Sequence, residues 1–585
     1  MNKKSLKTLL VISSIMLSYS GVQACTNFLI TAGASKDGST FVTYAADSHT
    51  LYGELYYRPA ATYSEGTMMD VYEWDTGKKL GQIRQATKTY SVVGNMNEHQ
   101  LVIGETTYGG IEELHDKDGL IDYGSLIYIT LQRAKNCREA IKIMAELIAE
   151  YGYCSEGESF SLADGKEVWI WEMIGTGKKV LDKNGNPDAK KNFKSAVWVA
   201  RRIPDGYICG HANQARITTF PKEDGKTSIS SKNLSKIMLP TVETVYFSEV
   251  INYARNIGLY SGTDEAFSFS DVYNPVTFSG ARYCESRVWA AFMHASPSQM
   301  KQYEDYARGE NLKHRMPLWI KPDKLLGVED VMSLMRDHFE GTSMDMTKDV
   351  GAGPYACPYR WRPMEWTCEG GKYLHERATS TQQTGFSFVA QSRSKYPAQV
   401  GGVFWFGVDD TYSTVYMPIF CGITQIPYAI KEGNGNMLHY SSTSAFWLFN
   451  QVSNFAYSRY SDMIVDIQKV QKELESDFIS QVNANTDKFV ALWKQDTAKC
   501  IVALNGFSNK AVAETFNKWK SLSEYLLVKY MDGNVKKEKD GKFLDNGFDP
   551  KQPQQPEHPQ YPQWYYKFII DNAGHNLRYL EDEKK

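Results

Sequence analysis

The sequence changes character at Val22-Gln23-Ala24-Cys25-Thr26-Asn27, where a leader typical of exported proteins ends and a strand begins. Before it, Lys3, Lys4 and Lys7 form a basic region. The segment from Leu9 to Leu17 forms an apolar run that is too short to span a membrane. Residues 1–24 are therefore predicted to be a signal peptide.

Val22 and Ala24 are the small residues that signal peptidase needs, and they place the cut directly before Cys25. A cut there predicts a secreted or periplasmic protein that begins at Cys25. A lipid-anchored protein is the alternative, since lipid is also attached to a cysteine after a signal. Gln23 suits a lipobox poorly, which favours simple cleavage. N-acylation of Cys25 would remove the free amine, so the two readings exclude each other.

An N-terminal cysteine has chemical consequences of its own. It would carry a thiol and a free α-amino group on one residue, which supplies a nucleophile together with a nearby base. Cys25 is therefore the predicted catalytic residue.

Composition limits the class of partner. The formal net charge is -3, so the chain has no excess of positive charge with which to neutralise a nucleic acid. No later segment approaches the roughly 18 apolar residues of a membrane helix. The length of 585 residues allows one large domain with additions or two domains.

The nine cysteines lie at 25, 137, 154, 209, 284, 357, 368, 421 and 500, without a CxxC pair or metal-ligand spacing. This spacing predicts neither a metal nor a cofactor. The odd count leaves at least one thiol unpaired in an oxidising compartment, and Cys25 is the natural candidate. For Cys357 and Cys368, a disulfide and two separate thiols both remain open.

A hairpin follows Cys25. Residues 26–32 are strand-like, Lys36-Asp37-Gly38 forms a turn, and the strand from Thr40 returns. Asp47 comes after this second strand, so it is placed near the amine of Cys25. The alternative for Asp47 is a turn residue that caps backbone amides.

Residues 90–107 predict a second strand pair, joined at Asn95 to Gln100. Asn97 at the tip is either an amide donor to an oxyanion or an ordinary turn residue. Glu105, on the outgoing strand, either pairs with a substrate ammonium or lies on the surface.

Helical spacing predicts two helices from Tyr123 to Tyr151, separated at Asn136 and ended by Gly152. Strands follow around Asp164-Gly165 and at 195–201. Hairpins, then helices, then further strands indicate an α+β layered domain. Asn213 and Arg282 are added as candidate site residues, Arg282 because a cation at a helix start opposes the helix dipole.

Beyond about residue 440 the pattern becomes that of charged amphipathic helices, notably 461–484 and 510–530. The predicted organisation is a main domain at 25–435, a helical extension at 436–535 and a Pro/Gln-rich, partly extended tail at 536–585.

Four segments together resemble the C69 family of cysteine dipeptidases. They begin at Cys25, Gly94, Ile103 and His211 and read CTNFLI, GNMNEH, IGETTYGG and HANQARI. The resemblance implies an N-terminal nucleophile hydrolase fold, a four-layer αββα sandwich, and dipeptides as substrates. The related bile-salt hydrolases and penicillin V acylases make an N-acyl amidase the alternative function.

The same resemblance implies site residues. Cys25 takes the nucleophile position and Asp47 the aspartate position, Asn97 and Asn213 match the asparagines, and Arg282 matches a later arginine. Tyr44 departs from the pattern, because many relatives have an arginine there. Dipeptide preference and oligomeric state, a homo-oligomer included, stay open.

Overall fold

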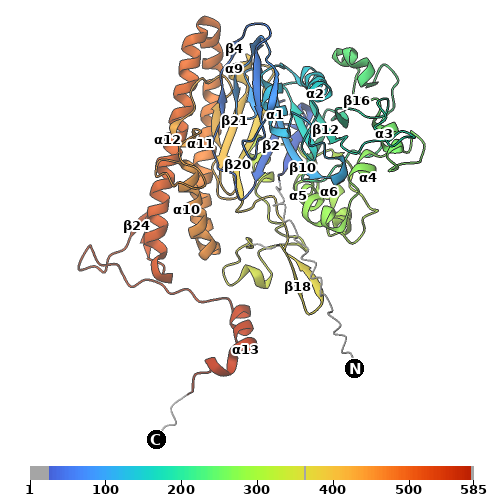
Figure 1. Ribbon diagram of the computed structural model, residues 1–585. Coiled ribbons are helices and arrows are strands. Elements are labelled where there is room, and N and C mark those ends of the chain that lie inside the picture. Colours follow the sequence, from blue (N-terminus) through green and yellow to red (C-terminus); the bar gives the residue numbers. More distant parts are fainter. Residues whose placement is uncertain (1–24, 362–363, 581–585) are drawn as a thin grey trace, which may run out of the picture.

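The computed structural model describes residues 25–361 and 364–580. The predicted signal peptide, residues 1–24, lies outside the described residues. The fold mixes α and β structure around two large sheets, and Figure 1 shows these sheets side by side with helices along both sides.

The first sheet has seven strands, and every neighbouring pair is antiparallel. Their spatial order is β17 (Trp319–Ile320), β14 (Ile208–His211), β1 (Asn27–Ile30), β2 (Thr40–Asp47), β20 (Thr384–Ser392), β21 (Val403–Val408) and β22 (Met417–Phe420). The predicted hairpin is thus confirmed at the centre of the sheet, where Leu29 pairs with Val42.

The second sheet has nine strands. Their order is β15 (Ser228–Ser230), β16 (Thr244–Tyr246), β13 (Ala196–Arg202), β12 (Val168–Gly175), β11 (Gly157–Ala163), β10 (Val102–Gly109), β9 (Met96–Asn97), β8 (Val92–Val93) and β3 (Tyr57–Arg58). Only the pair β15 and β16 runs parallel within this sheet. The expected strand pair at 90–107 is three strands instead, because β8 and β9 form a tight hairpin before β10.

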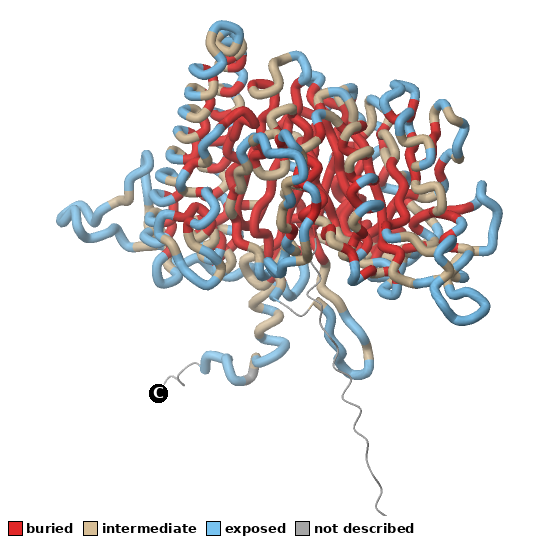
Figure 2. Tube along the Cα trace, turned by 45° about the horizontal axis from the view of Figure 1, so that its top comes forward, coloured by how far each residue is buried: buried red, intermediate tan, exposed pale blue. Residues whose placement is uncertain are grey.

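The two sheets pack face to face, since β1 and β2 both contact β10 and β11. Strands of both sheets are buried along almost their whole length, for example all eight residues of β2 and of β12. Figure 2 shows this buried interior as a continuous block through both sheets. Such strands read as apolar runs because both of their faces are covered.

Helices α1 (Tyr123–Leu131) and α2 (Cys137–Tyr151) contact the second sheet. Asn136 caps α2 by accepting from the Glu139 amide, and Gly152 ends it at φ 78°, as predicted. The shorter helices are α3 (Val250–Asn256), α4 (Phe269–Tyr273), α5 (Ser286–Ala295), α6 (Pro297–Met300), α7 (Glu304–Ala307), α8 (Val328–Leu334) and α9 (Ala398–Gly401).

Three helices cover the first sheet at its β21 and β22 edge: α10 (Ala445–Ser458), α11 (Tyr460–Gln495) and α12 (Thr497–Tyr530). Their buried side chains join the same hydrophobic core as the sheet. The predicted helices are confirmed and are longer than expected. The tail holds one further helix, α13 (Gln563–Leu577), which the Pro-rich pattern before it did not indicate.

The remaining strands form small hairpins: β4 (Ala61–Thr62) with β7 (Lys88–Thr89), β5 (Met68–Tyr72) with β6 (Lys79–Arg84), β18 (Glu365–Cys368) with β19 (Gly371–Leu374), and β23 (Glu538–Lys539) with β24 (Lys542–Phe543). All nine cysteines are described and each is a free thiol, so Cys357 and Cys368 form no disulfide here. In the described part of the chain, no helix is both long and apolar enough to cross a membrane.

Candidate active site

Cys25 lies two residues before β1 and is 6% exposed. Thr26 exchanges two main-chain hydrogen bonds with Ala45 of β2, at 3.3 and 3.0 Å. This pairing brings the start of β1 to the end of β2, so Asp47 lies beside Cys25. The main chain of Asp47 hydrogen-bonds the Cys25 sulfur. The hairpin therefore places these two residues as the sequence predicts, although Asp47 is the last residue of β2 rather than the residue after it.

The Asp47 carboxylate is buried and held from two directions. Arg377 Nη2 donates to Oδ2 at 2.7 Å, and Thr384 Oγ1 donates to Oδ1 at 2.6 Å. Burial raises the pKa of Asp47, and the guanidinium of Arg377 opposes that rise. An aspartate fixed in this way can orient a neighbouring ammonium or amine.

Tyr44 connects the thiol to two buried carboxyls. Its hydroxyl lies 3.5 Å from Cys25 Sγ and donates a hydrogen bond to Glu105 Oε1. Glu105 in turn lies close enough to Glu158 for a carboxyl–carboxyl hydrogen bond. Tyr44, where relatives were expected to have an arginine, therefore supplies a hydroxyl in place of a positive charge.

These neighbours make the thiol a weak acid. Burial, followed by the charges of Glu105 and Asp47, raises the pKa of Cys25 well above its ordinary value. The hydroxyl of Tyr44 and the amide of Asp47 act in the opposite direction. Ionisation of Cys25 thus needs a base in addition to the side chains around it.

Arg287 on α5 is the cation that reaches the nucleophile. Its Nη1 donates to the Cys25 carbonyl oxygen and to Thr26 Oγ1, both at 2.7 Å. Its Nη2 donates to Asn213 Oδ1 at 2.8 Å. Burial lowers the pKa of Arg287 to about 10, so it stays charged at neutral pH.

Asn213 follows β14 and stands in the left-handed region, at φ 57°, a conformation that asparagine tolerates better than most residues. Its amide nitrogen donates to the carbonyl oxygen of Thr107 at 2.5 Å. Asn213 is thereby tied both to β10 and to Arg287, and the structure joins it to the Cys25 site as predicted.

Arg282 is not at this site, which corrects the prediction made for it. Its Nε donates to Glu376 Oε2 at 2.9 Å, and its Nη1 donates to the carbonyl oxygen of Arg308 at 3.1 Å. It stands in a π-helical turn, Gly280–Glu285, directly before α5. Arg287 comes five residues later, and a helix turns by about 100° per residue, so the two side chains leave from different faces. The position of Arg287 directly before the apolar run Val288 to Phe292 was the available signal for a buried role.

Asn97 was also assigned wrongly. Its amide nitrogen donates to the carbonyl oxygens of Leu131 and Ala134, at 2.8 and 2.7 Å. Its Oδ1 accepts from the amides of His99 and Leu101. Both of its amide hydrogens are therefore used in joining β9 to the end of α1, and none remains for an oxyanion.

The histidine nearest in sequence to Asn213 also has a structural role. His211 is bonded to Thr106 Oγ1 through Nδ1 and to Ser161 Oγ through Nε2, both at 2.7 Å. Burial lowers its pKa to about 3, so the ring is neutral and fills the space between the sheets. Among the described residues, no imidazole contacts the Cys25 thiol, so this is not a cysteine–histidine pair.

Comparisons with known proteins identify the family of this chain. The model of "Peptidase family C69" matches residues 50–473. A probable dipeptidase of Latilactobacillus sakei is 23% identical over 77% of this chain and 85% of its own. A probable dipeptidase of Salmonella dublin is 23% identical over 72% of this chain and 86% of its own.

A third relative is a probable dipeptidase B of Streptococcus pyogenes serotype M1, 22% identical over 72% of each chain. Among solved structures, penicillin V acylase from Agrobacterium tumefaciens aligns with 26% of this chain and 48% of its own, at 15% identity and a TM-score of 0.19. That likeness is too slight for any conclusion. The family match covers most of the chain, and the chain therefore belongs to peptidase family C69.

Proposed function

We propose that this chain is a cysteine dipeptidase that acts through Cys25 as its N-terminal residue. The observation that carries the proposal is the convergence of Asp47, Asn213 and Arg287 on a buried cysteine at the start of a central strand. The names of the C69 relatives support dipeptides as the substrates. Two stacked sheets with helices on both sides support the four-layer αββα arrangement of an N-terminal nucleophile hydrolase.

No imidazole of residues 25–361 or 364–580 contacts the thiol, so the α-amine is the best candidate for the general base. An α-amine has a reference pKa of about 7.7 to 8.0, so it can accept the thiol proton near neutral pH. Asp47, held by Arg377 and Thr384, orients that amine in our proposal. The amine requires prior removal of residues 1–24, which makes export the activating step and a secreted or periplasmic protein the expected product.

The thiolate then attacks the carbonyl carbon of the first peptide residue. The oxyanion is stabilised by Asn213, whose Oδ1 is fixed by Arg287. The peptide C–N bond breaks, and the protonated amine of Cys25 gives its proton to the leaving amino group. Water hydrolyses the thioester, which releases the first residue and restores the thiol.

An intact-mass measurement on the exported protein, combined with a substrate assay, tests the proposal. We expect a mature protein that begins at unmodified Cys25 and hydrolyses dipeptides. A lipid mass on Cys25 would indicate the surface-anchored alternative. Activity on N-acyl amides with none on dipeptides would indicate the related amidase function.

A further inference from the structure

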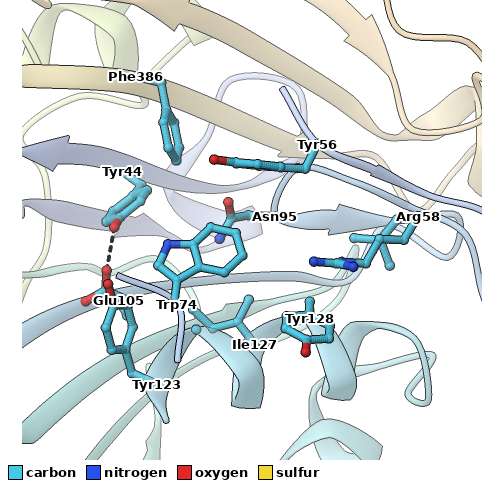
Figure 3. A pocket seen from close by; sticks show the side chains of 13 residues that line it. Tyr44, Tyr56, Arg58, Trp74, Asn95, Glu105, Tyr123, Ile127, Tyr128 and Phe386 are labelled. Atoms are coloured by element: carbon cyan, nitrogen blue, oxygen red, sulfur yellow. Dashed lines mark hydrogen bonds between the residues drawn. The ribbon is translucent and has the colours of Figure 1, made fainter. Parts of the chain in front are cut away.

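A cavity is lined at one end by Tyr44, the residue whose hydroxyl lies 3.5 Å from the Cys25 sulfur. It contains about 500 Å³ of space not filled by atoms, part of it open to solvent. Tyr44 and Glu105 line one end, and Figure 3 shows Arg58 and Tyr128 at the opposite end. Since the Tyr44 hydroxyl contacts Cys25 Sγ, a substrate carbonyl at the thiol would extend the rest of its residue into this cavity.

The end nearest Cys25 is acidic. Glu105 on β10 is 2% exposed and Glu158 on β11 is 0% exposed, and each has a carboxylate oxygen that accepts no hydrogen bond from an amide or hydroxyl of the described residues. Neither forms an ion pair within the described chain. Two such carboxyls that share one proton carry one negative charge between them. Burying a negative charge without a cation costs free energy. This arrangement therefore favours the binding of a positively charged ligand group.

Nearby groups reinforce the negative potential at this end. Asp75 accepts a hydrogen bond from the hydroxyl of Tyr123 at 2.8 Å, and its charge acts on Glu105. Arg287, the cation bonded to the Cys25 carbonyl oxygen, is committed to main-chain oxygens, Thr26 and Asn213. Arg287 is therefore not a partner of Glu105, whose carboxyl is left for a ligand.

The position of Glu105 fits one substrate group in particular. In a peptide, a single carbon separates the α-nitrogen of the first residue from its carbonyl carbon. A group that binds this nitrogen must then lie within a few ångströms of the nucleophile. Glu105 meets this condition, since only the Tyr44 hydroxyl stands between its Oε1 and Cys25 Sγ, and it also approaches the thiol directly.

Between Glu105 and Arg58 the cavity wall is largely apolar, with Asn95 as a polar exception. Tyr56, Trp74, Ile127 and Phe386 present rings or methyl groups to it, as Figure 3 shows. Gly124 on α1 permits the close packing of Trp74, because a Cβ at this position would lie 2.5 Å from that side chain. Such a wall suits an apolar side chain rather than a charged one.

We propose that this cavity is the subsite for the first residue of the peptide, where Glu105 binds the free α-ammonium group and the aromatic wall holds an apolar side chain. The inference rests on the proposed peptidase function and narrows its substrates to dipeptides with an unblocked amino terminus. An N-acylated dipeptide has no positive charge at this position, so it would leave the carboxylate unpaired. A site built around a buried polar group rejects an analogue that lacks the partner by about 10⁴-fold.

The test compares Leu-Ala with N-acetyl-Leu-Ala. For the mature wild-type protein we expect kcat/KM to favour Leu-Ala by about 10⁴-fold. Glu105→Gln should lower kcat/KM for Leu-Ala by about 100-fold or more, mainly through KM, and should leave the acetylated peptide almost unchanged. Glu172→Gln is the matched control, because Glu172 is a buried glutamate of the same sheet, on β12, that accepts hydrogen bonds from the amides of Arg216 and Ile217. It should keep the preference between the two peptides.

Calorimetry with the Cys25→Ala protein gives a readout that needs no catalysis. We expect it to bind Leu-Ala but not N-acetyl-Leu-Ala, and to lose this binding when Glu105→Gln is added. Hydrolysis of both peptides at similar rates, or an unchanged preference in Glu105→Gln, would overturn the subsite while the peptidase function stands. If wild type neither hydrolyses nor binds either peptide, the proposed function fails, and the subsite fails with it.

Discussion

Arg287 donates a hydrogen bond to the main-chain oxygen of Cys25 at 2.7 Å, so a residue 262 positions later fixes the nucleophile. We expect Arg287→Gln to lower kcat roughly 100-fold, since misplacement by about 1 Å can cost that much. The matched control is Arg282→Gln, which alters an arginine of the same helical stretch that pairs with Glu376. Equal kcat values for wild type and Arg287→Gln would contradict this role.

Tyr44 offers a prediction on pH dependence. Its hydroxyl lowers the pKa of the Cys25 thiol, against the larger effects of burial and nearby carboxylates. In Tyr44→Phe the thiol pKa should rise further. The midpoint of the pH dependence of Cys25 alkylation by iodoacetamide, which reports the thiol directly, should then move upward by about one unit, the size expected for a lost hydrogen bond to a charged group. An unmoved midpoint would show that Tyr44 does not act on the thiol.

Asn97 should matter for stability alone. Asn97→Ala leaves two buried carbonyls and two buried amides without their side-chain partner. We expect it to lower the free energy of unfolding by about 3 kcal/mol, measured by urea denaturation, with kcat unchanged at a temperature where the variant is folded. A large loss of kcat in fully folded Asn97→Ala would restore the catalytic role that the structure argues against.

Asp409 connects the first sheet to α10. Its titration should make the stability of the protein depend on pH. It accepts hydrogen bonds from Asn450 at 2.8 Å and Ser453 at 2.5 Å. Burial, together with the charge of Asp410, raises its pKa to about 7. The unfolded value is about 3.9, so the folded protein holds the proton more tightly. The tighter proton binding by Asp409 adds to the free energy of unfolding. This stabilisation is complete below about pH 4 and is lost as pH rises through 7.

Asp409→Asn removes this titration. The fall in unfolding free energy between pH 5 and pH 8 should therefore shrink by about 2 to 3 kcal/mol relative to wild type. Urea denaturation at the two pH values measures it. An identical pH dependence in both proteins would mean that Asp409 is ionised throughout this range.

Local signals in the sequence predicted much of the fold. The turn at Lys36-Asp37-Gly38 and the alternation around it gave the hairpin of β1 and β2, and this hairpin alone brings Asp47 to Cys25. The cap at Asn136 and the stop at Gly152 likewise defined α2. Each of these features depends on neighbours within a few residues.

The rest of the site depends on contacts that no local pattern contains. Tyr44 belongs to one sheet and Glu105 to the other, so their hydrogen bond exists only because the sheets stack in one register. Whether Arg282 or Arg287 faces Cys25 depends on the rotation of α5 against both sheets. From the sequence, Asn97 was either an oxyanion donor or an ordinary turn residue, whereas in the structure the end of α1 and the residues after it accept both of its amide hydrogens.

Hydrolysis of Leu-Ala by the mature wild-type and Cys25→Ala proteins, compared side by side, tests the central claim most directly. The account predicts turnover by wild type and none by Cys25→Ala, with both proteins folded by circular dichroism and beginning at residue 25 by intact mass. Turnover by purified Cys25→Ala at a rate near that of wild type would contradict the assignment of Cys25 as the nucleophile.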